Sequence, residues 1–148
     1  TSSSDAKIER LKKLGADFTL NYKATPDWGK KAREWSGHGV DLVVEVGGVG
    51  TLNESIRATR IGGTIAFIGV LAGPPLSDSR LPLMVMPQQR PQGATLGSVE
   101  DLQAMADAIA ANGMKPVIDK IFSFDQVKQA FAHMESGAHF GKVAIAIG

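Results

Sequence analysis

The sequence predicts an α/β protein with a doubly wound, mainly parallel sheet and helices on both faces of that sheet. Two short runs, Leu42–Val46 and Thr64–Ile68, are apolar and rich in β-branched residues. Their lack of polar alternation is typical of parallel strands that are covered on both faces. A segment of helix length separates the two runs, and helical and strand patterns alternate along the rest of the chain. This alternation favours a doubly wound fold.

The first helix is expected from Asp5 to Leu14, because apolar residues recur there at helical spacing. Ser4 suits the N-cap position, and Gly15 suits the residue that follows the helix. Lys7 then occupies the third helical position, where the helix dipole disfavours a cation. Two explanations are open at this point: an ordinary solvated lysine, or a cation that has a specific task.

The other elements follow from the same kind of pattern. A strand is expected over Asp17–Tyr22 and a helix over Pro26–Trp35. Residues 70–91 hold five of the seven prolines and are expected to form a loop. Beyond them we expect a strand over 94–98, a helix over 100–112, a strand over 117–124, a helix over 125–136 and a strand over 141–147.

Glycines stand directly at the carboxyl ends of both apolar runs. Gly47 and Gly48 follow the first run, and Gly69 follows the second. In an open α/β sheet, ligands bind outside the carboxyl ends of the strands, and a glycine there lets the backbone approach a ligand closely. The alternative is that these glycines only form tight turns. The residues alone leave both explanations open.

Composition narrows the class of protein. The 148 residues give room for one ordinary domain, and the formal net charge of +1 gives no general field for nucleic acid or an anionic membrane. The absence of cysteine excludes disulfides and thiolate metal sites. No segment reaches transmembrane length, and no charged-then-apolar leader opens the chain. We therefore expect a cytoplasmic protein that binds neither nucleic acid nor membrane.

The common reaction motifs are absent from the sequence. Gly48-Val49-Gly50 follows the first apolar run, but Asn53 stands where the third glycine of a dinucleotide fingerprint belongs. His133 and His139 are not spaced as metal ligands on one helical face, and no nucleophile elbow of the GxSxG type is present. The sequence therefore assigns no catalytic residue and no metal ligand within this chain.

Four segments resemble the carboxyl-terminal half of the zinc-type medium-chain alcohol dehydrogenases and quinone oxidoreductases: TSSSDAKIERLKKLGAD, VDLVVEVGG, GGTIAFIGV and KPVIDKIFSFDQVKQAFAHMESGAHFGKVAI. The resemblance implies an incomplete Rossmann-like domain over residues 1–114, without its first strand and glycine fingerprint. It implies that residues 115–148 form a tail that returns to the family's catalytic domain. The zinc ligands and proton-relay residues of the family lie outside these segments, so none is carried over, and the zinc dependence of a longer parent stays open.

The resemblance also implies a cofactor site near the start of the chain. Relatives that use NADPH place a lysine and a tyrosine around the 2′-phosphate, at positions that match Lys7 and Tyr22. NAD-preferring relatives carry an acid at the end of the second strand, and Ser2, Ser3 and Ser4 occupy this neighbourhood here; of these, Ser3 and Ser4 are the expected cofactor contacts. A compact ammonium neutralises a phosphate, and small hydroxyls donate to it. We therefore expect NADP as the cofactor, while NAD remains the alternative because Asp5 could serve a ribose diol.

Two further clusters follow from the same resemblance. One is expected to bring backbone against the nicotinamide ribose and carboxamide; its members are Val46, Gly47, Gly48, Gly69, Val70 and Leu71. The other is expected near the nicotinamide from the end of the chain; its members are Phe140, Gly141 and Lys142. Lys142 has an alternative interpretation as a surface charge at the start of a strand.

The sequence thus favours the cofactor-binding part of an NAD(P)H-dependent oxidoreductase that transfers hydride to or from an alcohol, aldehyde, quinone or enone. The chain alone is expected to be inactive, with a small-molecule substrate bound only by a longer parent. The alternative is a non-catalytic α/β fragment or oligomerisation module with weak or no nucleotide binding. The missing first strand would leave a gap in the sheet, and unpaired strand edges invite association. We therefore expect either a shortened form of a longer protein or a homo-oligomer, such as a dimer, that fills the gap.

Overall fold

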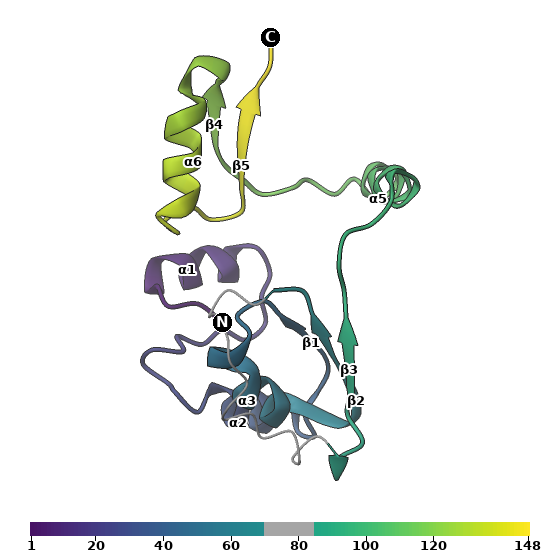
Figure 1. Cartoon of the computed structure of the whole chain (residues 1–148). Coiled ribbons are helices and arrows are strands. Elements are labelled where there is room, and N and C mark those ends of the chain that lie inside the picture. Colours follow the sequence, from purple (N-terminus) through teal and green to yellow (C-terminus); the bar gives the residue numbers. More distant parts are fainter. Residues whose placement is uncertain (70–84) are drawn as a thin grey trace. The chain divides into compact units, whose positions relative to one another are not determined.

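The computed structural model describes residues 1–69 and 85–148 (Figure 1). Contacts divide the chain into two compact units, Thr1–Leu96 and Gly97–Gly148. Each unit holds one parallel sheet, of three strands in the first and two in the second. The division predicted between residues 114 and 115 follows the domain order of the family and stays a prediction.

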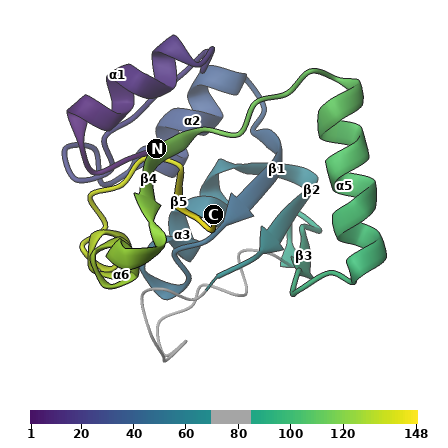
Figure 2. The ribbon, with the colours of Figure 1, turned by 90° about the horizontal axis from the view of Figure 1, so that it is seen from above.

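The first unit is built around a strand, turn, helix and strand, as the sequence predicts. Strand β1 (Val40–Glu45) leads through a glycine turn into α3 (Val49–Ala58), which is followed by β2 (Thr59–Phe67). Strand β3 (Arg90–Gly93) completes a sheet of order β1-β2-β3, in which every pairing is parallel. Figure 2 shows the three strands in this order, with α3 beside β1. The predicted parallel α/β architecture is confirmed.

The core of the first unit lies between α3 and the sheet. Leu52 and Ile56, four residues apart on α3, pack with Ile65 of β2, whose side chain is fully buried. Val43 and Phe67 are partly buried against this cluster. The spacing of the helical pair places both side chains on one face, so one helix covers two neighbouring strands.

The other side of β1 differs from the prediction. Because alternate residues of a strand point to opposite faces, Leu42 and Val44 point away from Val43. Their side chains are 55% and 57% exposed, and Val46 just beyond the strand is also exposed. The apolar run predicts cover on both faces, whereas the described residues bury mainly the face toward α3.

The helix at the start of the chain forms as predicted. Helix α1 spans Asp5–Lys13, and the Ser4 hydroxyl accepts a hydrogen bond from the backbone N–H of Lys7 at 3.4 Å. Gly15, just after the C-cap residue, has a φ of +93°, which glycine adopts without strain. Ser4 and Gly15 therefore bound the helix in the roles that the sequence assigns to them. Helix α2 (Trp28–Ser36) likewise lies within two residues of its predicted bounds.

The strand predicted over Asp17–Tyr22 is wrong. In this segment the structure has only an isolated parallel bridge between Ser2 and Asn21. The Ser2 N–H donates to the Leu20 carbonyl at 3.0 Å, and the Tyr22 N–H donates to the Ser2 carbonyl at 3.1 Å. A strand needs a pairing partner along several successive residues, and among the described residues only Ser2 forms a bridge with this segment.

The strand predicted over residues 94–98 is also wrong, because the pairing lies four residues earlier, at Arg90–Gly93. This strand has no apolar residue, contains Pro91 and is exposed throughout. Proline is tolerated at a sheet edge, where its missing N–H is not needed. The strand forms because β2 offers a parallel partner from Thr64 to Phe67, which no local pattern reveals.

The second unit contains one strand, helix and strand repeat. Strands β4 (Ile118–Ser123) and β5 (Lys142–Ala146) pair in parallel. A short 3₁₀ helix, η1 (Phe124–Gln126), leads into α6 (Val127–Glu135), which joins the strands. Phe122 of β4 and Ala130 of α6 are the buried apolar residues of the second unit. These elements agree with the predicted ones to within a few residues.

Helix α5 (Val99–Ala111) opens the second unit and buries none of its residues. A capping box starts this helix: the Ser98 hydroxyl accepts from the backbone N–H of Asp101, and the Asp101 carboxylate accepts from the Ser98 N–H. Across both units, none of the described helices combines the length and the apolar character that crossing a bilayer requires.

Candidate functional site

The carboxyl ends of β1 and β2 meet at one edge of the sheet. The backbone carbonyl of Glu45 accepts hydrogen bonds from the N–H groups of Ile68 at 2.9 Å and Gly69 at 3.3 Å. A Cβ atom added to Gly69 would lie 2.7 Å from the Val46 carbonyl oxygen, so a larger residue would push the two chain segments apart. The structure thus brings Val46 and Gly69, both predicted site residues, into direct contact.

The turn after β1 requires glycine at both of its positions. Gly48 is the N-cap of α3 with φ +76° and ψ −134°, a conformation that residues with a side chain rarely adopt. A Cβ atom on Gly47 would collide with the Thr51 side chain. The turn itself therefore explains these two glycines, and the close approach of a ligand to them stays a prediction.

A buried carboxylate, which the sequence reasoning missed, holds this turn in place. The Glu45 residue is 2% exposed, and its Oε1 accepts from the N–H groups of Gly47 at 2.8 Å and Gly48 at 2.9 Å. The hydroxyls of Thr51 and Ser55 donate to the same carboxylate. Four donors and the amino end of α3 compensate a charge that has left water.

The sequence does contain a signal for this arrangement. Glu45 is an acid in an otherwise apolar run, and it lies two residues before Gly47, the first residue of the glycine turn. Thr51 and Ser55 are four residues apart, which places both hydroxyls on one face of α3. An acid at the end of a buried strand, followed by such a pair, predicts a capped helix start.

The amino-terminal segment forms a second part of the candidate site. The bridge between Ser2 and Asn21, with the hydrogen bond from the Tyr22 N–H to the Ser2 carbonyl, holds residues 2–4 next to Tyr22. Ser4 caps α1, so the backbone of Lys7 lies in the first turn above that segment. Ser3 and Tyr22 are exposed, and Lys7 is half-buried. The fold thus holds Ser3 and Ser4 beside Tyr22, whereas a shared site of these residues with Lys7 stays a prediction.

Asp5 bears on the choice between the two nicotinamide cofactors. Its Oδ1 accepts a hydrogen bond from the Asn21 Nδ2 group at 2.7 Å. A carboxylate has two oxygens with several lone pairs, so this bond leaves further acceptor capacity for a ribose diol. The bond also draws the carboxylate toward Asn21, which is the residue beside Tyr22.

The predicted residues at the end of the chain belong to the second unit. Gly141 has a φ of +96°, and a Cβ atom there would collide with the Val117 carbonyl. The Lys142 N–H donates to the same carbonyl at 2.8 Å, which starts the pairing of β5 with β4. The approach of Phe140, Gly141 and Lys142 to a nicotinamide stays a prediction. Val70 and Leu71 lie outside the described residues.

Within residues 1–69 and 85–148, no three His, Cys, Asp or Glu side chains come together to hold a metal ion. The described residues thus offer no set of protein ligands such as a zinc site requires. The glycines at the carboxyl edge, by contrast, allow close packing against Thr51 and the Val46 carbonyl.

The parallel sheet, the glycine turn at its carboxyl edge and the helix that begins there define the class of the chain: a Rossmann-like α/β module. The family follows from comparison with known proteins. Residues 14–145 match the model of the zinc-binding dehydrogenases, and the chain belongs to this family.

Individual relatives agree with this assignment. A zinc-type alcohol dehydrogenase-like protein of Schizosaccharomyces pombe is 41% identical, with 99% of this chain and 44% of the relative covered. A Leishmania amazonensis protein named "Probable quinone oxidoreductase" is 30% identical, with 99% and 48% covered. The crystal structure of an NAD-dependent alcohol dehydrogenase superposes with a TM-score of 0.86 at 29% identity, covering 98% of this chain and 42% of that one. The chain therefore spans less than half the length of these relatives.

Proposed function

We propose that this chain is the cofactor-binding part of an NADP(H)-dependent oxidoreductase whose substrate is an alcohol, aldehyde, quinone or enone. Family membership supports an oxidoreductase, since the relatives carry the names of dehydrogenases and reductases. The observation that supports NADP is the pairing of Ser2 with Asn21, which keeps the serine segment beside Tyr22, with Lys7 in the first turn of the helix that this segment caps.

The residues present fit such a cofactor at two places. Lys7 supplies a cation, and Ser3 and Tyr22 supply hydroxyls, which together suit a 2′-phosphate. The backbone at Val46, Gly47, Gly48 and Gly69 would face the nicotinamide half, held in position by the Glu45 carboxylate. When bound, the nicotinamide gives or takes the hydride, while this chain orients it.

Two observations support NAD as a competing cofactor. An NAD-dependent enzyme is among the similar structures, and Asp5 offers a carboxylate near Tyr22. NAD is therefore the competing cofactor.

The exposed apolar face formed by Leu42 and Val44 supports self-association, because exposed apolar strands pair readily with other chains. A homo-oligomer is our proposal for this face, and a folded monomer in analytical ultracentrifugation would contradict it.

Calorimetric titration of NADPH and NADH into the chain tests the cofactor. We expect tighter binding of NADPH, and we expect Lys7→Ala to weaken NADPH by about tenfold while leaving NADH nearly unchanged, as for the loss of one charge-assisted hydrogen bond. Tyr22→Phe should act in the same direction and more weakly. Lys12→Ala is the matched control, because Lys12 lies on the same helix but pairs with Glu9 at 2.6 Å.

Four results would argue against parts of this proposal. Equal binding of NADPH and NADH to the unmodified chain would remove the 2′-phosphate site. Equal losses in Lys7→Ala and Lys12→Ala would show a general charge effect rather than a specific contact. Binding of neither cofactor would favour the non-catalytic module, and reduction of a substrate by this chain alone would overturn the expected inactivity.

A further inference from the structure

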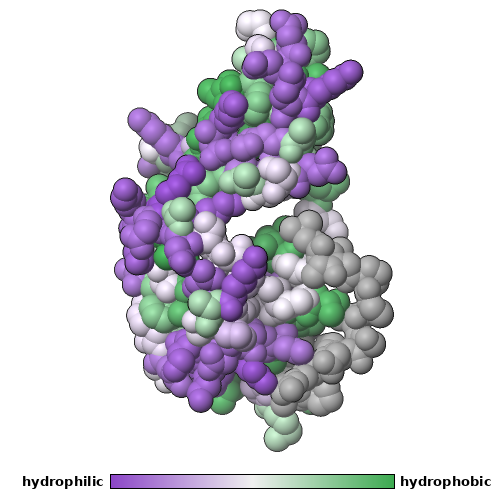
Figure 3. All heavy atoms as spheres, turned by 90° about the vertical axis from the view of Figure 1, so that its left-hand side faces the viewer, coloured by the Kyte–Doolittle hydropathy of each residue, from purple (hydrophilic) through white to green (hydrophobic). Residues whose placement is uncertain are grey.

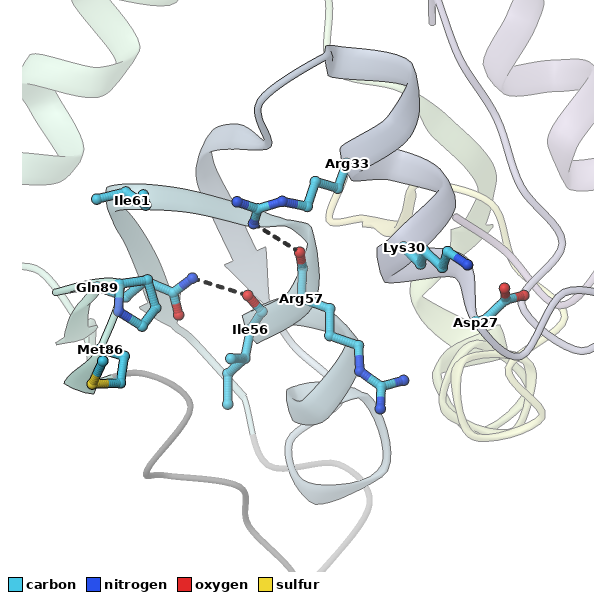
Figure 4. A pocket seen from close by; sticks show the side chains of 9 residues that line it. Asp27, Lys30, Arg33, Ile56, Arg57, Ile61, Met86 and Gln89 are labelled. Carbon is cyan, nitrogen blue, oxygen red and sulfur yellow. Dashed lines mark hydrogen bonds between the residues drawn. The ribbon is translucent and has the colours of Figure 1, made fainter.

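A cavity of about 600 Å³ opens at the amino edge of the first unit's sheet, at the opposite ends of the strands from the glycine turn. It is lined by residues of α2, the last turn of α3, the start of β2 and the segment before β3. Figure 4 shows these side chains from close by. Its volume is within the range of cavities that hold small ligands.

One wall of the cavity is apolar. Ile56 at the back is buried, whereas Ile61 is 65% exposed and Met86 is 86% exposed. Pro87 lies next to Met86 in the same wall. Large apolar side chains that border a cavity and face water gain stability when an apolar group covers them. Hydrophilic residues cover much of the face presented in Figure 3, with smaller hydrophobic areas between them.

The opposite wall is cationic. Lys30, Arg33 and Arg57 line it, with Asp27 as the acidic residue among the lining side chains. Arg57 pairs with Glu54 at 2.5 Å, and Lys30 lies 3.9 Å from Glu34. Arg33 is thus the lining cation that has no ion pair among the described residues. The Arg33 Nη1 group donates to the carbonyls of Thr59 at 2.9 Å and Arg57 at 3.3 Å, which fixes the guanidinium in place (Figure 4). A guanidinium has five N–H donors. Its Nε and Nη2 groups have no acceptor among the residues that the structure describes.

A buried polar group in the cavity lining is left without a partner. Gln89 is 8% exposed, and its Nε2 donates to the carbonyls of Ile56 at 2.9 Å and Thr59 at 2.8 Å. These two acceptors fix the orientation of the amide, because a flipped amide would point its oxygen at two carbonyls. Its Oε1 is buried and has no hydrogen-bond partner in the described part of the chain.

From these contacts we propose that the amino-edge cavity binds an amphipathic anion: an apolar chain or ring that carries one carboxylate or phosphate head. The head would pair with Arg33 and Lys30, and the apolar part would cover Ile61 and Met86. Arg33 is held ready by the two backbone carbonyls, so binding would order few side chains and lose little entropy.

Titration calorimetry with octanoate and octyl phosphate tests this site, with 1-octanol and acetate as probes that lack the head or the chain. We expect saturable binding of at least one amphipathic anion, and the tighter of the two identifies the head group. Lys30→Met should weaken this binding by about threefold, as for one partly exposed charge. Ile61→Asp should weaken it by about tenfold, because it removes apolar contact and adds repulsion.

Two matched variants control for nonspecific effects. Lys31→Met removes the neighbouring lysine of α2, which does not line the cavity. Both lysines pair with Glu34, Lys30 at 3.9 Å and Lys31 at 3.0 Å, so the two variants differ mainly in their position relative to the cavity. Ile68→Asp adds the same charge beyond the other end of β2. Both should leave the dissociation constant unchanged, and circular dichroism should show that all four variants fold. The proposal is overturned if neither anion binds saturably, if octanol binds as tightly, or if each control weakens binding as much as its partner.

Discussion

At both edges of the first unit's sheet, side chains form hydrogen bonds with backbone groups near an end of α3, but the backbone groups are donors at one edge and acceptors at the other. At the carboxyl edge the groups that need a partner are the N–H donors of Gly47 and Gly48 in the turn into α3, and the buried Glu45 carboxylate accepts from them. At the amino edge the unpaired groups are carbonyls at the end of α3, and Arg33 and Gln89 donate to them. A helix leaves donors at its start and acceptors at its end, so the sign of each edge follows from the chain direction.

Our two binding proposals follow from the same difference. The carboxyl edge leaves backbone accessible at Val46 and Gly69, where a side chain on the glycine would not fit. The amino edge keeps long side chains, with an apolar wall at Ile61 and a fixed cation at Arg33. Backbone suits the flat rings and sugars of a dinucleotide, whereas a cation beside apolar groups suits an amphipathic anion.

The largest effect is expected from breaking the carboxyl edge. Glu45→Ala should lower the free energy of unfolding by about 3 kcal/mol, because it leaves buried N–H and hydroxyl donors without an acceptor. Urea unfolding followed by circular dichroism measures this loss. Glu9→Ala is the control, since that exposed glutamate pairs only with Lys12 on the surface of α1. A loss below about 1 kcal/mol would mean that water replaces the carboxylate.

Breaking the amino edge should cost somewhat less. Gln89→Leu keeps the volume and removes the two bonds to Ile56 and Thr59, and we expect a loss of about 2 kcal/mol in the same unfolding experiment. Part of the loss is offset because the unpaired Oε1 atom also disappears. Gln92→Leu is the control, because Gln92 is exposed on β3 and bonds only to Gly93. Equal stability of the two variants would contradict a structural role for Gln89.

A third substitution tests cofactor binding at the carboxyl edge alone. Gly69→Ala places a methyl group against the Val46 carbonyl and should weaken NADPH by about tenfold, with a stability loss of about 1 kcal/mol. Gly93→Ala is the matched control, because a Cβ atom there meets nothing within 4 Å. Calorimetric titration of the two variants compares them directly. Equal NADPH affinity in both would place the cofactor elsewhere.

The smallest effect is a pH dependence at the amino edge. The hydrogen bond and the charge of Arg60 hold the pKa of Asp41 below its ordinary value. A lowered pKa means that the folded state is favoured above the ordinary aspartate pKa, and that this contribution disappears as the pH falls through the lowered value. Asp41→Asn should remove this small acid-side slope from the unfolding midpoint. An unchanged slope in the variant would assign the effect to other carboxyl groups.

The sequence predicts the elements that local patterns define. The apolar runs of β1 and β2 and the Ser4 and Gly15 bounds of α1 all depend on neighbours in sequence, and all are confirmed. The strand at Arg90–Gly93 could not be predicted, because it contains no apolar run and only a distant partner makes it a strand.

The site shows the same limit. Glycine positions can be read from the sequence, whereas the four donors around Glu45 come together only when α3 folds back on β1. Gln89 carries no local signal at all, since its two acceptors lie 30 and 33 residues earlier in the chain. Interactions between distant residues are thus what sequence reasoning missed at the amino edge, whereas the contacts of Glu45 span only two to ten residues and have a signal in the sequence.

The most direct test of this account maps backbone amide chemical shifts by nuclear magnetic resonance while NADPH is added to the chain. We predict saturable shifts at Val46, Gly47, Gly48 and Gly69 and in the segment around Lys7, with none at Ile61 and Gln89. Octanoate should give the reverse pattern. Saturable NADPH shifts confined to the amino edge, or no difference between the two edges, would contradict the assignment of the carboxyl edge to the cofactor.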